Sequence, residues 1–218
     1  MINWSKIETV LLDMDGTLLD LRFDNYFWQT VVPEKYAAKL GLSLEQALEH
    51  LQPIFKAQEG LLNWYCLDYW SKELDLDIVK LKHDMRDQVR VLPYTRDFLQ
   101  AVKLSGKRCV LVTNAHLGSL QIKMQQTGLV EFFDAIVSSH DLGYPKENQG
   151  FWRELTKLET FDKVSTVLVD DSLSVLKAAD VFGVQYLVAI TQPDSTQAPR
   201  MIHEFSAVGD LSEIKPFS

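Results

Sequence analysis

The stretch Thr9-Val10-Leu11-Leu12-Asp13-Met14-Asp15-Gly16-Thr17 decides the fold of this chain. Its apolar first half stops abruptly at Asp13, and a short apolar run bounded by polar turn residues is typical of a buried parallel strand. Two acids and a glycine follow directly. Because ligands bind at the carboxyl ends of the strands in an open parallel sheet, the stretch predicts both a strand and a ligand site beside it.

Four more apolar runs follow the same pattern, and segments with helical spacing separate them. The predicted strands are residues 108–113, 135–138, 166–170 and 185–190, and the predicted helices are residues 95–105, 117–127, 148–158 and 173–182. Glycines that follow several of these helices are the usual stop signal. Strands that alternate with helices predict an α/β fold, a Rossmann-like three-layer sandwich with a central parallel sheet.

Residues 21–91 break this alternation, because no comparable strand lies among them. They contain amphipathic stretches at residues 34–40, 43–55 and 77–91, and Ser43 and Gln46 have the spacing of a capping box. We therefore predict a small all-helical cap domain at residues 21–91, inserted into a Rossmann-like core made of residues 1–20 and 92–218.

The composition of the chain limits which partners and which cellular compartment we expect. The chain has 218 residues and a net charge of −8, and an acidic surface repels nucleic acid and anionic membranes, so we expect neither as a partner. No apolar stretch approaches a membrane span, and the N-terminus lacks the pattern of a signal peptide. The two cysteines, Cys66 and Cys109, are predicted to be buried free thiols, and the expected location is cytoplasmic.

Polar side chains gather where the predicted strands end. They are Asp13 and Asp15 after the first strand, Thr113 and Asn114 at the second, Lys146 in the loop after the third, and Asp170 and Asp171 at the fourth. Each pair alone would be explained by a surface turn or a helix cap. Their joint occurrence at strand ends favours one shared site.

The acids of this group suit a metal-assisted reaction on phosphate. Asp13, Asp15 and Asp170 can together hold a hard cation through oxygen, and Mg²⁺ prefers a few carboxylates with water and phosphate oxygens. The cation would offset the repulsion between the acids and an incoming phosphate. One carboxylate can then attack phosphorus, while the second protonates the leaving oxygen and later activates water.

The remaining residues of the group suit binding of the phosphate. Gly16 would let the backbone turn sharply beside the ligand. Thr113 and the backbone amides near Asn114 can donate to phosphate oxygens at the start of the next helix. Lys146 adds a positive charge that stabilises the phosphate and the covalent intermediate.

Together these residues resemble the four motifs of the haloacid dehalogenase-like hydrolase superfamily. Residues 13–18 match the first motif in full, and Thr113-Asn114, Lys146 and Asp170-Asp171 match the second, third and fourth. The helical insertion resembles the cap domain of that family. One departure is the proline that precedes Lys146, where many relatives have proline after the lysine.

The resemblance implies a role for each matched residue. Asp13 is implied to be the nucleophile and a metal ligand, and Asp15 the general acid/base that gives its backbone carbonyl to the metal. Thr113 and Lys146 are implied to bind phosphate. Asp170 is implied to bind Mg²⁺, and Asp171 to support the metal shell. Aspartate at position 15 resembles the phosphatases and phosphomutases, whereas dehalogenases of this fold lack an acid there.

A closer resemblance is to the bacterial purine 5′-nucleotidases that act on GMP and IMP. It rests on residues 12–21, 112–116 and 143–147, with similar segments at residues 23–25 and 191–195. It implies a phosphoric monoester hydrolase with a purine nucleoside monophosphate as substrate. A sugar-phosphate phosphatase and a phosphomutase would use the same residues and remain alternatives. A non-catalytic binding protein is disfavoured, because Asp13 and Asp15 are both present.

Substrate contacts beyond the phosphate are the least defined part of the site. The aromatics Phe23, Tyr26, Phe27 and Trp28 follow the first motif and would either stack on a nucleobase or form the core between cap helices. The cluster around Trp64-Tyr65 and Tyr69-Trp70 is predicted to be cap core. His116 would be either a ligand contact or a solvated residue at a helix start, and the second is favoured.

Overall fold

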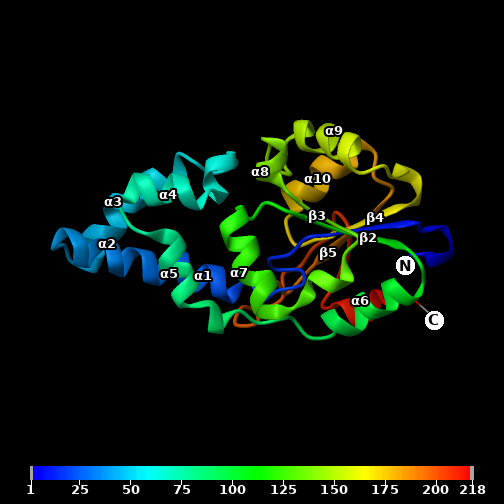
Figure 1. The fold of residues 1–218 in the computed structure, drawn as a ribbon, viewed down its shortest axis with the longest axis horizontal. Coiled ribbons are helices and arrows are strands. Elements are labelled where there is room, and N and C mark those ends of the chain that lie inside the picture. The colour runs from blue at the N-terminus through cyan, green and yellow to red at the C-terminus, as the bar shows by residue number, and fades with distance from the viewer. Residues whose placement is uncertain (1, 217–218) are drawn as a thin grey trace.

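The computed structural model describes residues 2–216, and the predicted α/β fold with a central parallel sheet is confirmed (Figure 1). All strands pair in parallel, in the order β3-β2-β1-β4-β5-β6. Their bounds are β1 Thr9–Leu12, β2 Arg108–Thr113, β3 Ala135–Ser138, β4 Thr166–Asp170, β5 Tyr186–Ile190 and β6 Ser206–Val208. Leu11 of β1 pairs with Val110 of β2 and with Leu168 of β4, so the strand that leads into Asp13 lies between two others.

Helices cover both faces of the sheet, which gives the three layers that the sequence predicts. Helices α6 (Thr95–Leu104) and α7 (Leu117–Thr127) pack on one face, and α9 (Gln149–Leu158) and α10 (Leu173–Phe182) pack on the other. Successive strand residues point to opposite faces, so Val10 and Leu12 join the first layer and Leu11 joins the second. All three are fully buried, as expected for a strand that is covered on both sides.

Residues 21–91, called here the helical insertion, lie to one side of the sheet in Figure 1. Their helices are α1 Arg22–Tyr26, α2 Val32–Leu40, α3 Leu44–Lys56, α4 Leu67–Leu74 and α5 Ile78–Asp84, with a π-helical turn at Phe27–Val31 and 3₁₀ turns at Leu62–Tyr65 and Arg86–Gln88. The insertion has its own apolar cluster around Phe27, Leu51 and Trp70. The division of the chain into two domains stays a prediction.

The two ends of the helical insertion run side by side. Leu19 forms an antiparallel bridge with Val91, and the amide of Leu92 donates to the carbonyl of Leu18 at 2.9 Å. The amphipathic stretch predicted at residues 77–91 is only partly helical, because α5 ends at Asp84 and the backbone at Val91 is extended to pair with Leu19. The predicted capping box is present, with Ser43 and Gln46 exchanging hydrogen bonds of 2.9 and 3.2 Å.

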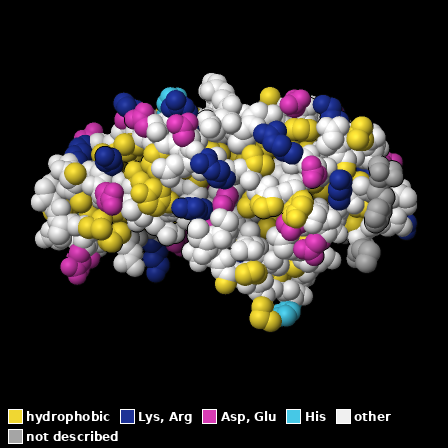
Figure 2. Space-filling view, turned by 90° about the horizontal axis from the view of Figure 1, so that it is seen from below, with side chains coloured by type: hydrophobic (Ala, Val, Ile, Leu, Met, Phe, Trp, Pro, Cys, Tyr) yellow, Lys and Arg dark blue, Asp and Glu magenta, His cyan; other side chains and the backbone are white. Residues whose placement is uncertain are grey.

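The remaining features of the fold concern its edge and its surface. The edge strand β6 is not among the predicted strands, and α8 (Ser139–Leu142) is a short helix directly after β3. Figure 2 shows acidic and basic side chains interspersed over one face of the molecule. In residues 2–216, no helix is both long enough and apolar enough to cross a bilayer.

Candidate active site

The carboxyl end of β1 carries the predicted nucleophile. The amide of Asp13 donates to the carbonyl of Val169 at 3.0 Å, which continues the pairing with β4, and the Asp13 side chain is buried. Gly16 adopts a φ of +88°, and a Cβ added there would lie 2.8 Å from Cγ of Asp171 and 2.9 Å from Cβ of Pro193. Only glycine allows the backbone to turn in this space.

A buried lysine joins the acids of two neighbouring strands. Nζ of Lys146 lies 2.5 Å from Oδ1 of Asp13 and 2.7 Å from Oδ2 of Asp170, and it also donates to the carbonyl of Val112 at 3.1 Å. Burial disfavours the charge of Lys146, but Asp13 and Asp170 outweigh this effect, so its pKa is raised and it stays protonated. We call Asp13, Lys146, Asp170 and Asp171 the core cluster.

Hydrogen bonds from Asn114 hold the loop that carries Lys146. The amide of Lys146 donates to Oδ1 of Asn114 at 2.9 Å, and Nδ2 of Asn114 donates to Oε2 of Glu147 at 3.0 Å. The indole of Trp152 donates to the carbonyl of Lys146 at 2.8 Å. Oγ1 of Thr113 accepts from the amide of Ala115 at 3.0 Å and stays at the cavity wall. The Asn114 side chain thus holds the loop of Lys146 in place. The predicted contact with phosphate therefore falls to the backbone amides near Asn114.

The core cluster fits a hard divalent cation. Asp13, Asp170 and Asp171 each offer a carboxylate oxygen, and these oxygens lie within 4.8 Å of one another. Burial raises the pKa of Asp13 to about 6, with Lys146 opposing the rise and Asp170 adding to it. Burial and the charges of Asp170 and Asp13 also raise the pKa of Asp171. Mg²⁺ is a hard cation that binds oxygen ligands, so closely spaced carboxylates with an excess of negative charge suit it.

The carboxylate of Asp15 does not belong to this group, so the expectation that the carboxylates of Asp13, Asp15 and Asp170 surround one ion is corrected. Oδ1 of Asp15 lies 2.7 Å from Nζ of Lys123, on helix α7, which draws the side chain away from the shared oxygens. Asp171 takes its place among the grouped carboxylates. The resemblance implies that Asp15 contributes its backbone carbonyl, and not its carboxylate, to the metal site.

Buried Lys123 begins a second group of charged side chains, which reaches into the helical insertion. Its Nζ also lies 2.6 Å from Oδ2 of Asp24, and Oδ1 of Asp24 lies 2.6 Å from Nζ of Lys82. We call Asp15, Lys123, Asp24 and Lys82 the interface cluster. Burial raises the pKa of Asp15 to about 6 although Lys123 opposes the rise, and Lys123 and Lys82 overcome burial to lower the pKa of Asp24 to about 2.

Sequence reasoning missed the three members of the interface cluster other than Asp15. Lys123 stands three residues after Leu120 and four before Thr127, on the buried face of α7. Lys82 stands four residues after the buried Ile78 of α5. A lysine on the apolar stripe of an amphipathic helix needs a partner when it is buried, and this is the signal that could have found both.

A cavity of about 440 Å³ connects the acids with the helical insertion. Asp13, Asp15, Thr113, Lys146 and Asp170 line one part of it, and the aromatics Trp28, Phe55, Trp64, Tyr65 and Trp70 line another. Of the early aromatics, Phe23 and Phe27 are core residues, and Tyr26 is 44% exposed and lies outside this cavity.

Trp64 and Trp70, which the sequence predicts to be core residues of the insertion, have two roles. Their rings pack edge to face with each other and with Phe55 inside the insertion, and the same three rings line the cavity. The hydroxyl of Tyr65 donates to Oε1 of Glu147 at 2.7 Å and so links the insertion to the loop of Lys146. His116 also lines the cavity; it caps α7 through Nδ1 and is only 16% exposed, so it is not a solvated residue.

Two segments singled out in the sequence meet near the start of the insertion. Nδ2 of Asn25 donates to Oδ2 of Asp194 at 2.7 Å, and Oγ of Ser195 donates to Oδ2 of Asp20 at 2.5 Å. The amide of Leu21 donates to the carbonyl of Pro193 at 2.9 Å. The loop after β5 thus anchors the first residues of the insertion.

Comparison with known proteins places this geometry in a family. A family model described as haloacid dehalogenase-like hydrolase matches residues 10–189. The chain is 42% identical over 215 residues to the GMP/IMP nucleotidase YrfG of Escherichia coli strain K12, which covers 99% of this chain and 97% of that protein. It is 28% identical to a phosphoglycolate phosphatase of Nitrosospira multiformis, over 81% of this chain and 80% of that one.

Among solved structures, a phosphatase of the same family from Thermococcus onnurineus superposes with a TM-score of 0.79. The match covers 95% of this chain and 96% of that chain at 23% identity, which shows a shared fold. The family model and the nearly full-length relative agree with the four motifs at the strand ends. The chain therefore belongs to the haloacid dehalogenase-like hydrolases.

Proposed function

We propose that this protein is a magnesium-dependent phosphatase that releases phosphate from purine nucleoside monophosphates such as GMP and IMP. One observation carries the proposal: a single cavity joins the acids and lysine of the core cluster to a wall of aromatic rings. The first part suits a phosphate, and aromatic side chains stack on nucleobases. The relative that is 42% identical over nearly its whole length bears the name GMP/IMP nucleotidase, which supports the same substrate class.

Asp13 and Asp15 divide the chemistry between them in the proposed reaction. A carboxylate oxygen of Asp13 attacks phosphorus, the bond to the ester oxygen breaks, and the leaving nucleoside oxygen takes a proton from Asp15. Asp15 then accepts a proton from the water that attacks the aspartyl-phosphate, which releases phosphate and restores both side chains. A pKa of about 6 leaves part of Asp15 protonated close to neutral pH, as the first step requires.

The remaining residues position the phosphate and balance its charge. Lys146 holds Oδ1 of Asp13 and supplies a buried positive charge beside the reacting group. Thr113 and the backbone beside Asn114 provide donors at the start of α7. Asp13, Asp170 and the backbone carbonyl of Asp15 would hold Mg²⁺, with Asp171 in support, and the ion would neutralise charge and polarise the phosphoryl group when bound.

Phosphate release from a substrate panel in the presence of Mg²⁺ tests the proposal. The panel contains GMP, IMP, AMP, a pyrimidine monophosphate, glucose 6-phosphate and phosphoglycolate. We expect the purine monophosphates to be hydrolysed with the highest kcat/KM. Equal turnover of the sugar phosphates would remove the nucleotide from the proposal, and isomerised sugar phosphate without free phosphate would indicate a mutase. No hydrolysis of any member would refute the phosphatase.

A variant in the aromatic wall tests the placement of the base. Trp64→Leu removes a ring that faces the cavity, and we expect KM for IMP to rise about tenfold, because stacking contributes about 1–3 kcal/mol per base. KM for phosphoglycolate, which has no base, should not change. Tyr26→Leu is the matched control, since Tyr26 is an exposed aromatic of the same insertion that lies outside the cavity. The assignment fails if both variants act alike or both substrates are affected equally.

The small-molecule substrate is the partner that this site supports, and the expected cytoplasmic location stays a prediction. Both cysteines are free thiols in the structure; Cys109 is buried as predicted, whereas Cys66 is only half-buried.

A further inference from the structure

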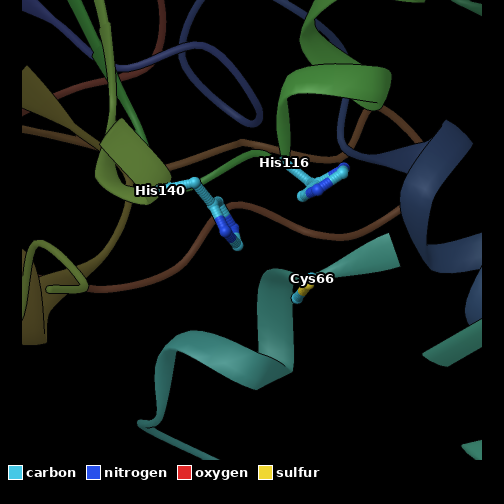
Figure 3. Close-up of side chains that lie close together, drawn as sticks. All are labelled: Cys66, His116 and His140. Carbon is cyan, nitrogen blue, oxygen red and sulfur yellow. The ribbon is translucent and has the colours of Figure 1, made fainter. Parts of the chain in front are cut away.

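A second group of metal-ligating side chains lies beside the cavity, apart from the core cluster. Cys66, His116 and His140 each offer one donor atom, and these atoms lie within 4.8 Å of one another. Figure 3 shows the three side chains coming from three separate segments, with the His140 ring reaching toward the start of α4, where Cys66 lies. Cys66 caps α4 in the helical insertion, whereas His116 caps α7 and His140 belongs to α8, both outside the insertion.

His140 has a donor atom that no side chain or backbone group uses. Its Nε2 is buried and has no hydrogen-bond partner among the described residues. Burial and the neighbouring His116 lower the pKa of His140 to about 4, so the ring is neutral. A neutral imidazole with a free ring nitrogen is the form that binds metals. A buried nitrogen without a partner costs free energy, which a bound cation would recover.

Contacts of His116 leave it in a suitable tautomer. Its Nε2 lies 3.5 Å from a carboxylate oxygen of Asp68, and its Nδ1 accepts a weak hydrogen bond of 3.3 Å from the amide of Gly118. Both contacts are satisfied when the proton resides on Nε2; the one lone pair of Nδ1 then accepts from Gly118, and a cation bound by Nδ1 would replace this weak hydrogen bond. A carboxylate that holds the far nitrogen of a histidine is the usual second layer around a metal ligand. The two imidazoles stand edge to face, with ring centroids 4.9 Å apart.

We propose that Cys66, His116 and His140 bind a divalent cation of the zinc class. One thiolate and two imidazoles suit Zn²⁺, whereas the all-oxygen donors of the core cluster suit Mg²⁺, so the two sites select different ions. Three protein ligands leave one tetrahedral position for water, as in open zinc sites. Binding releases the thiol proton of Cys66 to solvent, because the thiolate is the ligand.

The position of the ligands gives the ion a structural consequence. Cys66 belongs to the helical insertion, and the two histidines belong to the other part of the chain. A cation that binds all three therefore ties the insertion to the sheet at the edge of the cavity that His116 lines. This inference does not depend on the proposed substrate or reaction.

Cobalt spectroscopy of the full-length protein tests the site without using activity. Reduced protein is titrated with Co²⁺ in excess Mg²⁺, which occupies the carboxylates, and a thiolate-to-cobalt charge-transfer band reports coordination by sulfur. We expect this band at one equivalent and its loss when one equivalent of Zn²⁺ displaces Co²⁺.

Matched variants identify the ligands. Cys66→Ser keeps an oxygen to cap α4, since Sγ of Cys66 now accepts from the amide of Tyr69, and His116→Asn keeps a capping side chain on α7. Cys66→Ser should abolish the band. Because loss of even a second-layer partner costs 10–100-fold in metal affinity, each of Cys66→Ser, His116→Asn and His140→Gln should weaken Zn²⁺ binding by about 100-fold or more. Cys109→Ser removes the other free cysteine, which lies on β2, and should leave both band and affinity unchanged.

Three results would overturn the proposal. They are a wild-type protein without the charge-transfer band at millimolar Co²⁺, a band that survives Cys66→Ser or disappears in Cys109→Ser, and Zn²⁺ affinity that His140→Gln leaves unchanged. Circular dichroism and thermal unfolding of each variant ensure that folded proteins are compared. Should Cys66→Ser not fold, loss of the band in folded His140→Gln supports the site and its persistence refutes it.

Discussion

Two groups of buried lysines with buried or half-buried carboxylates flank the end of β1, and they differ in composition and in origin. The core cluster contains three carboxylates and one lysine, all from ends of strands in the parallel sheet and from the loops that follow them. The interface cluster contains two carboxylates and two lysines, and half of its members come from the helical insertion. Formal charges thus cancel in the interface cluster but leave the core cluster negative.

Because of this difference, the core cluster needs a further cation to balance its charge, whereas the interface cluster does not. Buried charges are stable only when they are paired, so the excess carboxylates of the core cluster favour a bound Mg²⁺. In the interface cluster each carboxylate already has a lysine, and the pairs join Asp15, which follows β1, to Asp24 and Lys82 of the helical insertion. We infer that the core cluster serves chemistry and that the interface cluster positions the insertion and tunes Asp15.

Asp13→Asn should have the largest effect and should act only on the chemistry. The amide is not a nucleophile toward phosphorus, so we expect kcat for phosphate release to fall by about 10⁴-fold or more. The unfolding transition should stay cooperative, because the amide relieves repulsion between buried acids. Initial rates with GMP or IMP measure the first effect and urea denaturation the second. Activity close to that of the wild type would remove Asp13 from the proposed mechanism.

Asp24→Asn should act mainly on stability. It leaves the buried Nζ groups of Lys123 and Lys82 with one carboxylate fewer, and breaking a buried ion pair costs about 3–5 kcal/mol in the free energy of unfolding. Urea denaturation at pH 7 measures the loss. Asp75→Asn is the control, since Asp75 pairs with Lys39 at the surface with 92% of its side chain exposed, and we expect almost no change there.

Acid should reduce the difference in unfolding free energy between the wild type and Asp24→Asn. The pKa of Asp24 is about 2 in the folded protein and near 3.8 in the unfolded chain, so its charge stabilises the fold above pH 3.8 and this contribution is lost as pH falls toward 2. The gap in unfolding free energy should therefore shrink below about pH 4, where the Asp24 carboxylate of the folded wild type becomes protonated. A gap that widens below about pH 4 would contradict the assigned pairing.

Mg²⁺ should stabilise the core cluster by an intermediate amount. A ligand present at 100 times its dissociation constant stabilises the folded state by about 2.7 kcal/mol, which thermal unfolding with and without Mg²⁺ detects. Asp170→Asn removes one carboxylate and should abolish most of this stabilisation. Asp24→Asn should retain it, because the interface cluster carries no excess charge. Equal loss in both variants would mean that the two clusters do not differ in the way proposed.

Lys123→Met should have the smallest effect on activity, a shift in its pH dependence. The positive charge of Lys123 lowers the pKa of Asp15, so its removal should raise that pKa above about 6. Asp15 must be protonated to serve the leaving oxygen, so the basic limb of kcat/KM should move to higher pH by about one unit. Lys123→Arg keeps the charge and should leave the limb in place. A shift to lower pH would exclude Lys123 as the group that tunes Asp15.

The comparison of the two clusters also explains what could be predicted from the sequence. Members of the core cluster stand where apolar strands stop, and the carboxyl ends of parallel strands meet at one edge, so local patterns sufficed to bring Asp13 and Asp170 together. Gly16 was predictable in kind, although its close approach to Asp171 and Pro193 depends on the fold.

Members of the interface cluster could not be found in the same way. Asp24 and Lys82 are separated from Lys123 in sequence and meet only when the insertion packs on α7, a contact that no local pattern encodes. Charged residues in amphipathic helices usually face solvent, so the sequence offered no reason to expect Asp24, Lys82 and Lys123 in a site. The Asp15 carboxylate was misplaced for the same reason, because its partner Lys123 was unknown. Strand β6 was missed because only three residues pair there.

The adjacency of the chain at Leu19 and Val91 has a consequence for the insertion. The backbone leaves the sheet at Leu19 and returns at Val91, and these two residues are bridged. The number of residues between them therefore does not determine how β1 pairs with its neighbouring strands. Lengthening, shortening or grafting a different lobe between these two points leaves the nucleophile's strand in register. A changed insertion would therefore alter the part of the cavity wall that its aromatic side chains form, while the carboxyl end of β1 keeps its place in the sheet.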